Sequence, residues 1–503
     1  MIPLLAPIFA EGRADDDALS CGADSLAYGE LRRRVGQARA VLGRCGVGPG
    51  DRVALCQPKS VATVVAMLAV MAAGAACAPL DPRQSAAQLD RVLRDLQPAL
   101  LIAPAEKIEP WRRLAPAASA MRFALLDARD GSLDIVGEAD GEAPAPSEAD
   151  VAMMLYTSGS TGAPKGIMLS QANIESFVDW GGEEFAIRPS DRLVNHAPLH
   201  FDLSIFDLFC GLGRGASVHL IDETTALFAG ALRKRIEAAG ATVWYSAPTA
   251  LAQLQERRAL RGLDHIRLVL FAGEVFPTPT LRRLMQDLPQ ATYANLYGPT
   301  ETNVCVFHRL VEPPASDLDV LPIGRPCRHC EVGVLDDSGA PVRPGEIGEI
   351  CVAGPSVMRG YWRRQDAFPR ADGWKPGAYR TGDYGFVRGD GELMLTGRRD
   401  QQVKVRGRRI ELLALESVLS GHPGVREAAA STSGGLDDAA LVAFVVARGG
   451  KPADLRDFVL ERLPPHYSPD HVEWLDQMPR NANGKIDRAR LRDLMAAHLG
   501  PPQ

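Results

Sequence analysis

The sequence predicts an α/β protein with mostly parallel sheets, in which a large N-terminal domain of several subdomains precedes a small α/β domain. Strand-like apolar runs alternate with helical patterns through most of the chain, which is typical of a parallel α/β core. The pattern restarts near residue 400, and a chain of 503 residues exceeds what one hydrophobic core usually holds. These observations favour two domains of unequal size.

The elements follow from periodicity and composition. An arginine-rich amphipathic stretch ends at Leu42, residues 53–56 predict a buried strand, and residues 61–73 predict a helix of small residues. Residues 137–150 are rich in Ala, Pro, Gly and acids, which indicates a surface linker. Further strands are predicted at 151–156, 242–246, 266–271 and 291–296. In the small domain we expect a helix at 410–419, a strand at 441–446, a helix at 453–463 and a last helix at 488–498.

Composition and charge exclude several classes of protein. Hydrophobic residues make up 46% and charged residues 23% of the chain, which is ordinary for a folded protein and excludes a disordered one. The net charge of −6 argues against a nucleic-acid partner. No apolar run reaches the ~18 residues of a membrane span, and Met1–Pro7 lacks the positive charge of a signal peptide. We therefore expect a cytoplasmic protein without a membrane partner.

Cysteine usage agrees with that compartment. Cys327 and Cys330 form a CxxC pair, but no second pair follows at the spacing of a zinc site. The other seven of the nine cysteines are scattered, mostly among apolar residues. We predict that these thiols pack as small hydrophobic side chains, with a metal or redox role of the CxxC pair as the alternative.

A glycine-rich loop follows the strand predicted at 151–156. Glycines let backbone N–H groups approach phosphate oxygens, hydroxyls donate hydrogen bonds, and one lysine supplies charge. The residues of this kind are Thr157, Ser158, Gly159, Ser160, Thr161, Gly162 and Lys165. The loop is neither a Walker A sequence nor a dinucleotide fingerprint, because it lacks their glycine and lysine spacing. It predicts a phosphate cradle of another kind.

Six blocks in one order resemble the signatures of the adenylate-forming enzymes: acyl-CoA synthetases, luciferases and nonribosomal peptide adenylation domains. The blocks are TSGSTGAPKG at 157–166, NLYGPTE at 295–301, GEIGEI at 345–350, YRTGD at 379–383, GRRDQQVKVRG at 397–407 and PRNANGK at 479–485. The resemblance spans nearly the whole chain. It implies ATP and Mg²⁺ as cofactors, and a division into a core at 1–399 and a mobile C-terminal domain at 400–503.

The resemblance also implies roles for single residues. In this family a carboxylate meets the α-phosphate of ATP, so catalysis needs charge neutralisation and positioning. The implied catalytic residues are Lys485, which bridges carboxylate and phosphate, Glu301, which holds Mg²⁺ with Thr300 or Thr302 close by, and Thr157. The implied nucleotide contacts are residues 157–162 and Lys165, Asn295 for the adenine amine, Tyr297 for the adenine face, Gly298, Thr300, and Asp383 with Arg398 for the ribose. Asp400 is the implied hinge, and Gly407 the implied lining of a thiol tunnel.

A further block, HAPLHFDLSIFD at 196–207, resembles the start of an amino-acid pocket. In amino-acid activators an aspartate at the position of Asp202 pairs with the α-ammonium of the substrate. The other implied pocket residues are Phe201, Leu203, Phe206, Tyr245, Leu270, Ala272, Leu296, Val304 and Cys305. This lining is neutral and indicates a small to medium apolar amino acid, with proline, valine and alanine all open. Taken together, the set resembles that of free-standing L-proline-activating enzymes of pyrrole-forming pathways.

The sequence holds no condensation motif, and the 24 residues before Ser25, in a segment that resembles a carrier motif, are too few for a carrier domain. The acyl acceptor is therefore expected to be a separate peptidyl carrier protein with a phosphopantetheine arm. Three other interpretations stay open. A D-alanine–carrier protein ligase would share the pocket aspartate, and an acyl-CoA synthetase would have no need of Asp202. A nucleotide-binding protein with a dead site is disfavoured by the intact Lys485, Glu301 and Asp383.

Overall fold

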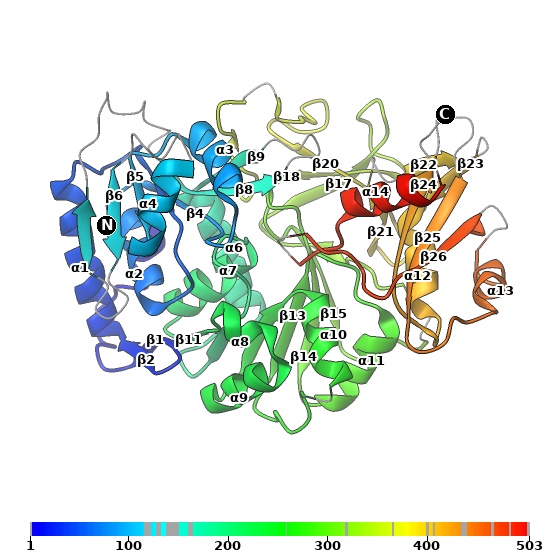
Figure 1. The fold of residues 1–503 in the computed structure, drawn as a ribbon, viewed down its shortest axis with the longest axis horizontal. Helices are drawn as coiled ribbons and strands as arrows, with labels where there is room; N and C mark the ends of the chain where they lie inside the picture. Colours follow the sequence, from blue (N-terminus) through cyan, green and yellow to red (C-terminus); the bar gives the residue numbers. More distant parts are fainter. Residues whose placement is uncertain are drawn as a thin grey trace.

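The computed structural model of the chain describes residues 3–114, 122–126, 132–136, 150–158, 164–257, 259–316, 320–364, 367–398, 402–405, 408–433, 440–463, 467–481 and 484–499. Figure 1 shows a large body, coloured blue to yellow, beside a smaller one in orange and red. The chain has the predicted α/β fold, with a large N-terminal and a small C-terminal domain. The linker expected at 137–150 lies outside the described residues, apart from Asp150.

A nine-stranded sheet with a parallel centre forms one part of the large domain. In spatial order its strands are β16 (Arg325–Pro326), β15 (Val306–Leu310), β14 (Thr292–Tyr297), β13 (Leu268–Ala272), β12 (Val243–Ser246), β10 (Arg192–Asn195), β11 (Ser217–Leu220), β1 (Asp17–Cys21) and β2 (Asp24–Ala27). Every neighbouring pair from β14 to β1 is parallel. The strands predicted at 242–246, 266–271 and 291–296 are confirmed, although β13 begins only at Leu268. The carboxyl ends of β10, β12, β13 and β14 meet at one end of the sheet, where open α/β sheets bind ligands.

An eight-stranded sheet forms the neighbouring part. Its strands, in spatial order, are β19 (Gly360–Tyr361), β9 (Pro164–Ser170), β8 (Val151–Ser158), β4 (Ala76–Pro79), β3 (Arg52–Leu55), β5 (Leu100–Ala103), β6 (Phe123–Leu126) and β7 (Leu133–Val136). The predicted helix of small residues is α2 (Val61–Ala72), and all of its residues are buried. A helix that is apolar on every side belongs in the interior, and Ser60 Oγ caps it by accepting from Thr63 N at 3.1 Å.

The other helices of the large domain cover these sheets. They are η1 (Pro3–Leu5), α1 (Tyr28–Arg44), α3 (Ala86–Leu96), α4 (Ala105–Leu114), α6 (Gln171–Glu184), α7 (Leu203–Ile205), the π-helical turn η2 (Phe206–Gly211), α8 (Glu223–Leu227), α9 (Ala229–Ala239), α10 (Pro248–Glu256) and α11 (Thr278–Asp287). In α1 the buried residues Leu31, Val35, Ala38 and Leu42 recur every three or four positions. That spacing places them on one face, as the amphipathic pattern predicts.

A four-stranded antiparallel sheet completes the large domain and adjoins the small one (Figure 1). Its strands are β17 (Glu331–Leu335), β18 (Gly348–Ala353), β20 (Tyr379–Val387) and β21 (Leu393–Arg398). The small domain contains β22 (Gln402–Val405), β23 (Arg408–Glu411), α12 (Leu412–Gly421), β24 (Val425–Ser433), β25 (Ala440–Ala447), α13 (Leu455–Leu460), β26 (His471–Trp474) and α14 (Arg488–Leu499). It has hydrophobic clusters of its own on both sides of β24 and β25.

One boundary in the small domain was predicted wrongly. The helix expected from Ile410 begins at Leu412, because Ile410 pairs with Val403 in the β22–β23 hairpin. The backbone groups of Ile410 are paired within the hairpin and cannot also form the first turn of a helix. The apolar side chain of Ile410 is therefore buried from a strand and not from a helix. The helix expected at 453–463 is present but shorter, and the strand at 441–446 and the last helix are confirmed.

Two further expectations concern membranes and cysteines. No helix in the described part of the chain is long and apolar enough to cross a membrane. All nine cysteines lie within that part and are free thiols, with Cys327 and Cys330 buried. This burial agrees with the predicted packing role.

Candidate active site

The glycine-rich segment connects two paired strands. Thr157 near the end of β8 lies opposite Lys165 at the start of β9. Gly159, Ser160, Thr161 and Gly162 lie outside the described residues, as does the side chain of Ser158. The side chains of Thr157 and Lys165 therefore flank the base of the loop, as expected from their places in the sequence. Lys165 Nζ lies 5.3 Å from the centroid of the Tyr361 ring.

Glu301 meets the same tyrosine. Tyr361 Oη donates to Glu301 Oε1 at 2.8 Å and lies 3.2 Å from Tyr379 Oη. One carboxylate oxygen of Glu301 is thus oriented by a buried phenol, which leaves Oε2 for another partner. The lysine of the loop and the carboxylate after β14 come together at Tyr361, although they lie far apart in the sequence.

The two threonines beside Glu301 differ in their surroundings. Thr302 is fully buried, and its hydroxyl donates to the carbonyl oxygen of Asn303 at 2.9 Å. Thr300 is only half-buried. Of the two threonines named from the sequence, Thr300 is therefore the one whose side chain is accessible.

The residues available to a metal ion are few. Among the described residues, no group of three or more His, Cys, Asp or Glu side chains is arranged to hold an ion alone. Mg²⁺ in phosphoryl chemistry is commonly held by one or two carboxylates together with the phosphates of the substrate. A single carboxylate near a phosphate loop, as at Glu301, fits that ion.

The predicted adenine and ribose residues lie side by side. Tyr297 Oη donates to Asp383 Oδ2 at 2.7 Å. Burial and the Asp383 carboxylate both raise the pKa of Tyr297, so its phenol remains a donor. Asp383 on β20 lies opposite Arg398 on β21, whose side chain is outside the described residues. Asn295 Nδ2 donates to the carbonyl oxygen of Pro322 at 2.9 Å, which leaves its amide oxygen to accept from an amine.

Gly298 allows the loop after β14 to turn tightly. A Cβ at this position would overlap the carbonyl oxygen of Asn303. Any side chain here would therefore push apart the loop that connects Tyr297 to Glu301. The predicted glycine is required by the backbone path and not only by a ligand.

Lys485 reaches the large domain from a tight turn of the small one. Asn481 Oδ1 accepts from Lys485 N at 3.1 Å, and Asn481 N donates to Lys485 O at 2.8 Å. Lys485 Nζ lies 3.6 Å from the position that a Cβ of Gly273 would occupy. Gly273 directly follows β13, at the same end of the sheet from which the segments to Asp202 and Glu301 depart. The lysine of the small domain thus lies near the carboxyl ends of the parallel strands.

The predicted amino-acid pocket is built from neighbouring strands. Tyr245 on β12 pairs with Leu270 on β13, and Ala272 on β13 pairs with Leu296 on β14. The Phe206 ring lies 5.8 Å from that of Tyr245, nearly perpendicular to it. The register therefore brings together residues that are scattered over the sequence.

The remaining wall of the pocket is neutral. Val304 and Cys305 are buried in the same cluster, and Leu203 packs against it. Burial raises the pKa of the Cys305 thiol well above its usual value, so it stays uncharged. Phe201 is half-buried, with its ring 5.0 Å from that of His200.

Asp202 supplies the one carboxylate among the predicted pocket residues. It is half-buried at the N-terminus of α7, and its side chain caps no backbone N–H there. Its charge acts on Tyr245, whose pKa is raised mainly by burial and further by Asp202 and Asp207. An uncapped carboxylate beside a neutral aromatic wall can pair with an ammonium group.

The structure adds two residues that no sequence pattern had marked as functional, Tyr361 and Gly273. Tyr361 stands in no pattern that marks it as functional, since its role depends on contacts between three sheets. Gly273 had a weak signal, because a glycine directly after an apolar strand can mark a ligand-binding turn. Like the four loop residues 159–162, the predicted hinge residue Asp400 and the predicted tunnel residue Gly407 lie outside the described residues.

Two family models match the chain, one in each domain. The family model of AMP-binding enzymes matches residues 8–362, and that of the AMP-binding enzyme C-terminal domain matches residues 414–485. The chain belongs to the AMP-binding enzyme family.

Individual relatives match over nearly their full length. An L-proline–(L-prolyl-carrier protein) ligase from Pseudomonas fluorescens is 38% identical, covering 93% of this chain and 94% of its own. One from Streptomyces coelicolor is 37% identical, covering 93% and 92%. Among solved structures, ATP-bound MatB from Rhodopseudomonas palustris superposes with a TM-score of 0.84 at 27% identity, covering 99% of both chains.

Proposed function

We propose that the protein uses ATP to activate L-proline as prolyl-adenylate and then transfers the prolyl group to the phosphopantetheine thiol of a separate peptidyl carrier protein. The observation that carries the proposal is the chemistry of the predicted pocket residues, among which the uncapped Asp202 is the one carboxylate beside buried apolar side chains. A secondary ammonium would pair with the carboxylate, and the ring of proline would contact the apolar residues. The two relatives named as L-proline ligases support the choice of amino acid.

In the first step the substrate carboxylate oxygen attacks the α-phosphorus of ATP, and pyrophosphate leaves. Lys485 lies at the carboxyl ends of the strands, where its ammonium would offset the negative charge of both reactants. Asp202 would hold the amino end of the substrate at the other side of the pocket. The two residues thereby fix the carboxylate in line with the phosphate.

The nucleotide would lie between the large and small domains. Tyr297 offers its ring to adenine, Asn295 its amide oxygen, and Asp383 its carboxylate to the ribose hydroxyls, with Arg398 opposite on β21. Thr157 and Lys165 would contact the phosphates at the base of the loop. Mg²⁺, held by Glu301 near Thr300, would neutralise charge on the phosphates.

In the second step the thiolate of the carrier attacks the carbonyl carbon of prolyl-adenylate, a thioester forms and AMP leaves. We propose that the small domain, residues 400–503, first rotates about Asp400 and removes Lys485 from the core at 1–399. Gly407 would then line the tunnel for the phosphopantetheine arm, since a side chain there would obstruct it.

The decisive experiment is ATP–pyrophosphate exchange with L-proline, D-alanine, L-valine and L-pipecolate. We expect the highest kcat/KM for L-proline, because its ring fills the apolar pocket and its ammonium still reaches Asp202. Preference for D-alanine would instead support the carrier ligase of that amino acid. AMP release that depends on CoA and an acid without an amine would support an acyl-CoA synthetase.

The Tyr361→Phe variant tests the orientation of Glu301. Loss of the 2.8 Å hydrogen bond frees the Glu301 carboxylate to rotate. We therefore expect an approximately tenfold lower affinity for MgATP and a smaller difference between the affinities for ATP with and without Mg²⁺. Calorimetric titration with ATP, with and without Mg²⁺, measures this in the absence of turnover. Tyr379→Phe is the matched control, since it removes the neighbouring hydroxyl and leaves the bond to Glu301. Equal affinities in all three proteins would contradict the assignment of Glu301.

A further inference from the structure

A buried lysine outside the proposed catalytic residues binds the end of a pocket strand. Lys59 precedes α2 and is 5% exposed. Its Nζ donates to three consecutive carbonyl oxygens, those of Asn195 at 3.1 Å, His196 at 3.1 Å and Ala197 at 2.7 Å. The ammonium thus connects the eight-stranded sheet, through the loop after β3, to the carboxyl end of β10 in the nine-stranded sheet.

The clamped segment holds two other parts of the pocket. Asn195 Nδ2 donates to Asp207 Oδ2 at 3.0 Å on η2. His196 Nδ1 lies within hydrogen-bond distance of Ser246 Oγ, at 2.9 Å, at the end of β12. The predicted pocket residue Phe206 lies on η2, and the predicted pocket residue Tyr245 lies on β12. Both elements are therefore attached to the segment that Lys59 binds.

The same segment leads into the turn that carries Asp202. Phe201 N donates to the carbonyl oxygen of Pro198 at 3.0 Å, and Ser204 Oγ donates to that of Phe201 at 2.7 Å. These bonds leave the six-residue path from Ala197 to Asp202 little freedom to absorb a shift. A displacement of the clamped carbonyls would therefore move the Asp202 carboxylate.

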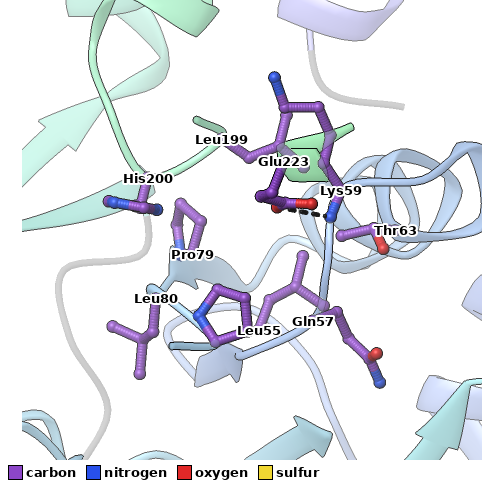
Figure 2. A pocket seen from close by; sticks show the side chains of 10 residues that line it. Leu55, Gln57, Lys59, Thr63, Pro79, Leu80, Leu199, His200 and Glu223 are labelled. Atoms are coloured by element: carbon purple, nitrogen blue, oxygen red, sulfur yellow. Dashed lines mark hydrogen bonds between the residues drawn. The ribbon is translucent and has the colours of Figure 1, made fainter. Parts of the chain in front are cut away.

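The lack of space and the three carbonyl partners of its ammonium argue against a ligand-binding role for Lys59. The adjacent cavity of about 10 Å³ has room for no more than one water molecule. Glu223 Oε1 accepts from the backbone N–H of Lys59 at 3.0 Å, and Figure 2 shows both residues at the cavity wall. Burial lowers the pKa of Lys59 to about 8, and the carboxylates of Glu223 and Asp207 oppose that shift. The protein therefore keeps a cation where burial disfavours one.

We propose that Lys59 is a positioning residue for amino-acid recognition, whose ammonium holds the end of β10 and, through it, Asp202, η2 and β12. The inference rests on the proposed function in one respect: it takes Asp202 as the partner of the substrate ammonium. The predicted nucleotide residues lie on β14 and the loop after it, on β20 and β21, and on the β8–β9 hairpin, whereas the ammonium of Lys59 donates to carbonyl oxygens of residues 195–197. The role of Lys59 is thus confined to the amino-acid side of the site.

The test is pyrophosphate exchange by Lys59→Met, with amino acid and ATP varied separately. Methionine keeps the unbranched stem out to Cε and loses the ammonium with its three N–H donors. We expect the KM for the amino acid to rise about tenfold and the KM for ATP to change less than about twofold. Lys234→Met, on the exposed side of α9, is the matched control and should leave both values unchanged.

Each other outcome is decisive as well. Equal rises in both KM values, or a lower kcat with both values unchanged, would overturn the proposal and make Lys59 a residue of general stability. If circular dichroism shows that Lys59→Met does not fold, Lys59→Gln takes its place, because the glutamine amide donates hydrogen bonds without carrying a charge. An unchanged KM for the amino acid in Lys59→Gln would overturn the proposal. A wild-type preference for another amino acid would defeat the L-proline assignment alone, since the selective KM change can be measured with that amino acid.

Discussion

Replacing Lys485 with alanine is expected to lower ATP–pyrophosphate exchange by about 10²- to 10³-fold, the loss typical of one preorganised electrostatic donor. A unit charge ~4 Å from a phosphate oxygen contributes roughly 4 kcal/mol of attraction at an effective dielectric of ~20. Lys485 Nζ stands 3.6 Å from the Cβ position of Gly273, at the strand ends where the reactants would meet. Initial exchange rates at saturating ATP and amino acid measure the effect.

The control for this variant is Lys451→Ala, an exposed lysine of the same small domain whose Nζ lies 5.8 Å from the Trp474 ring centre. It should exchange at the wild-type rate. Lys485 is itself exposed on its turn, so Lys485→Ala should keep the wild-type melting temperature. Exchange near the wild-type rate in Lys485→Ala would refute the catalytic assignment.

The second large effect is expected for Asp202. Asp202→Ala should raise the KM for the amino acid about 10²-fold, because truncating one partner of a desolvated charge pair commonly costs about 2–5 kcal/mol. The KM for ATP should change little, since Asp202 belongs to the β10 side of the site. Separate titrations of amino acid and ATP in the exchange assay give both values.

Asp202→Asn separates charge from shape. It keeps the size of the side chain, so an amino-acid KM as high as that of Asp202→Ala would assign the effect to the lost charge. Tetrahydrofuran-2-carboxylate, which has the ring of proline without its ammonium, should be rejected by the wild type and less so by Asp202→Asn. Equal changes in the KM for amino acid and ATP would mean that Asp202 is structural.

The strands and helices of the core were largely predictable because each carries its own periodicity. The all-apolar run of α2, the strand before the glycine-rich loop and the last helix were placed within a few residues. Boundaries failed where a tertiary partner competed, as at Ile410, which pairs with Val403 in a hairpin before the helix begins. The local sequence around Ile410 favours neither helix nor strand strongly, so the pairing with Val403 determines that it is a strand.

Much of the candidate site was also visible in the sequence, since its residues stand in recognisable blocks. Tyr297 and Asp383, named from separate blocks, are joined by a 2.7 Å hydrogen bond. Thr302, named as an alternative to Thr300, is buried with its hydroxyl bound to a carbonyl oxygen, which the block alone could not show.

By itself the sequence predicted which chemical groups would form the site and in which order: a loop for phosphate, a carboxylate for the metal, an aspartate for the ammonium and a lysine near the end. Only the tertiary structure decided how they are held. Lys59 and Tyr361 belong to no block, and each acts by joining segments that are distant in the chain. Contacts of that kind depend on sheet register and on how sheets pack together, and neither leaves a local pattern in the order of residues.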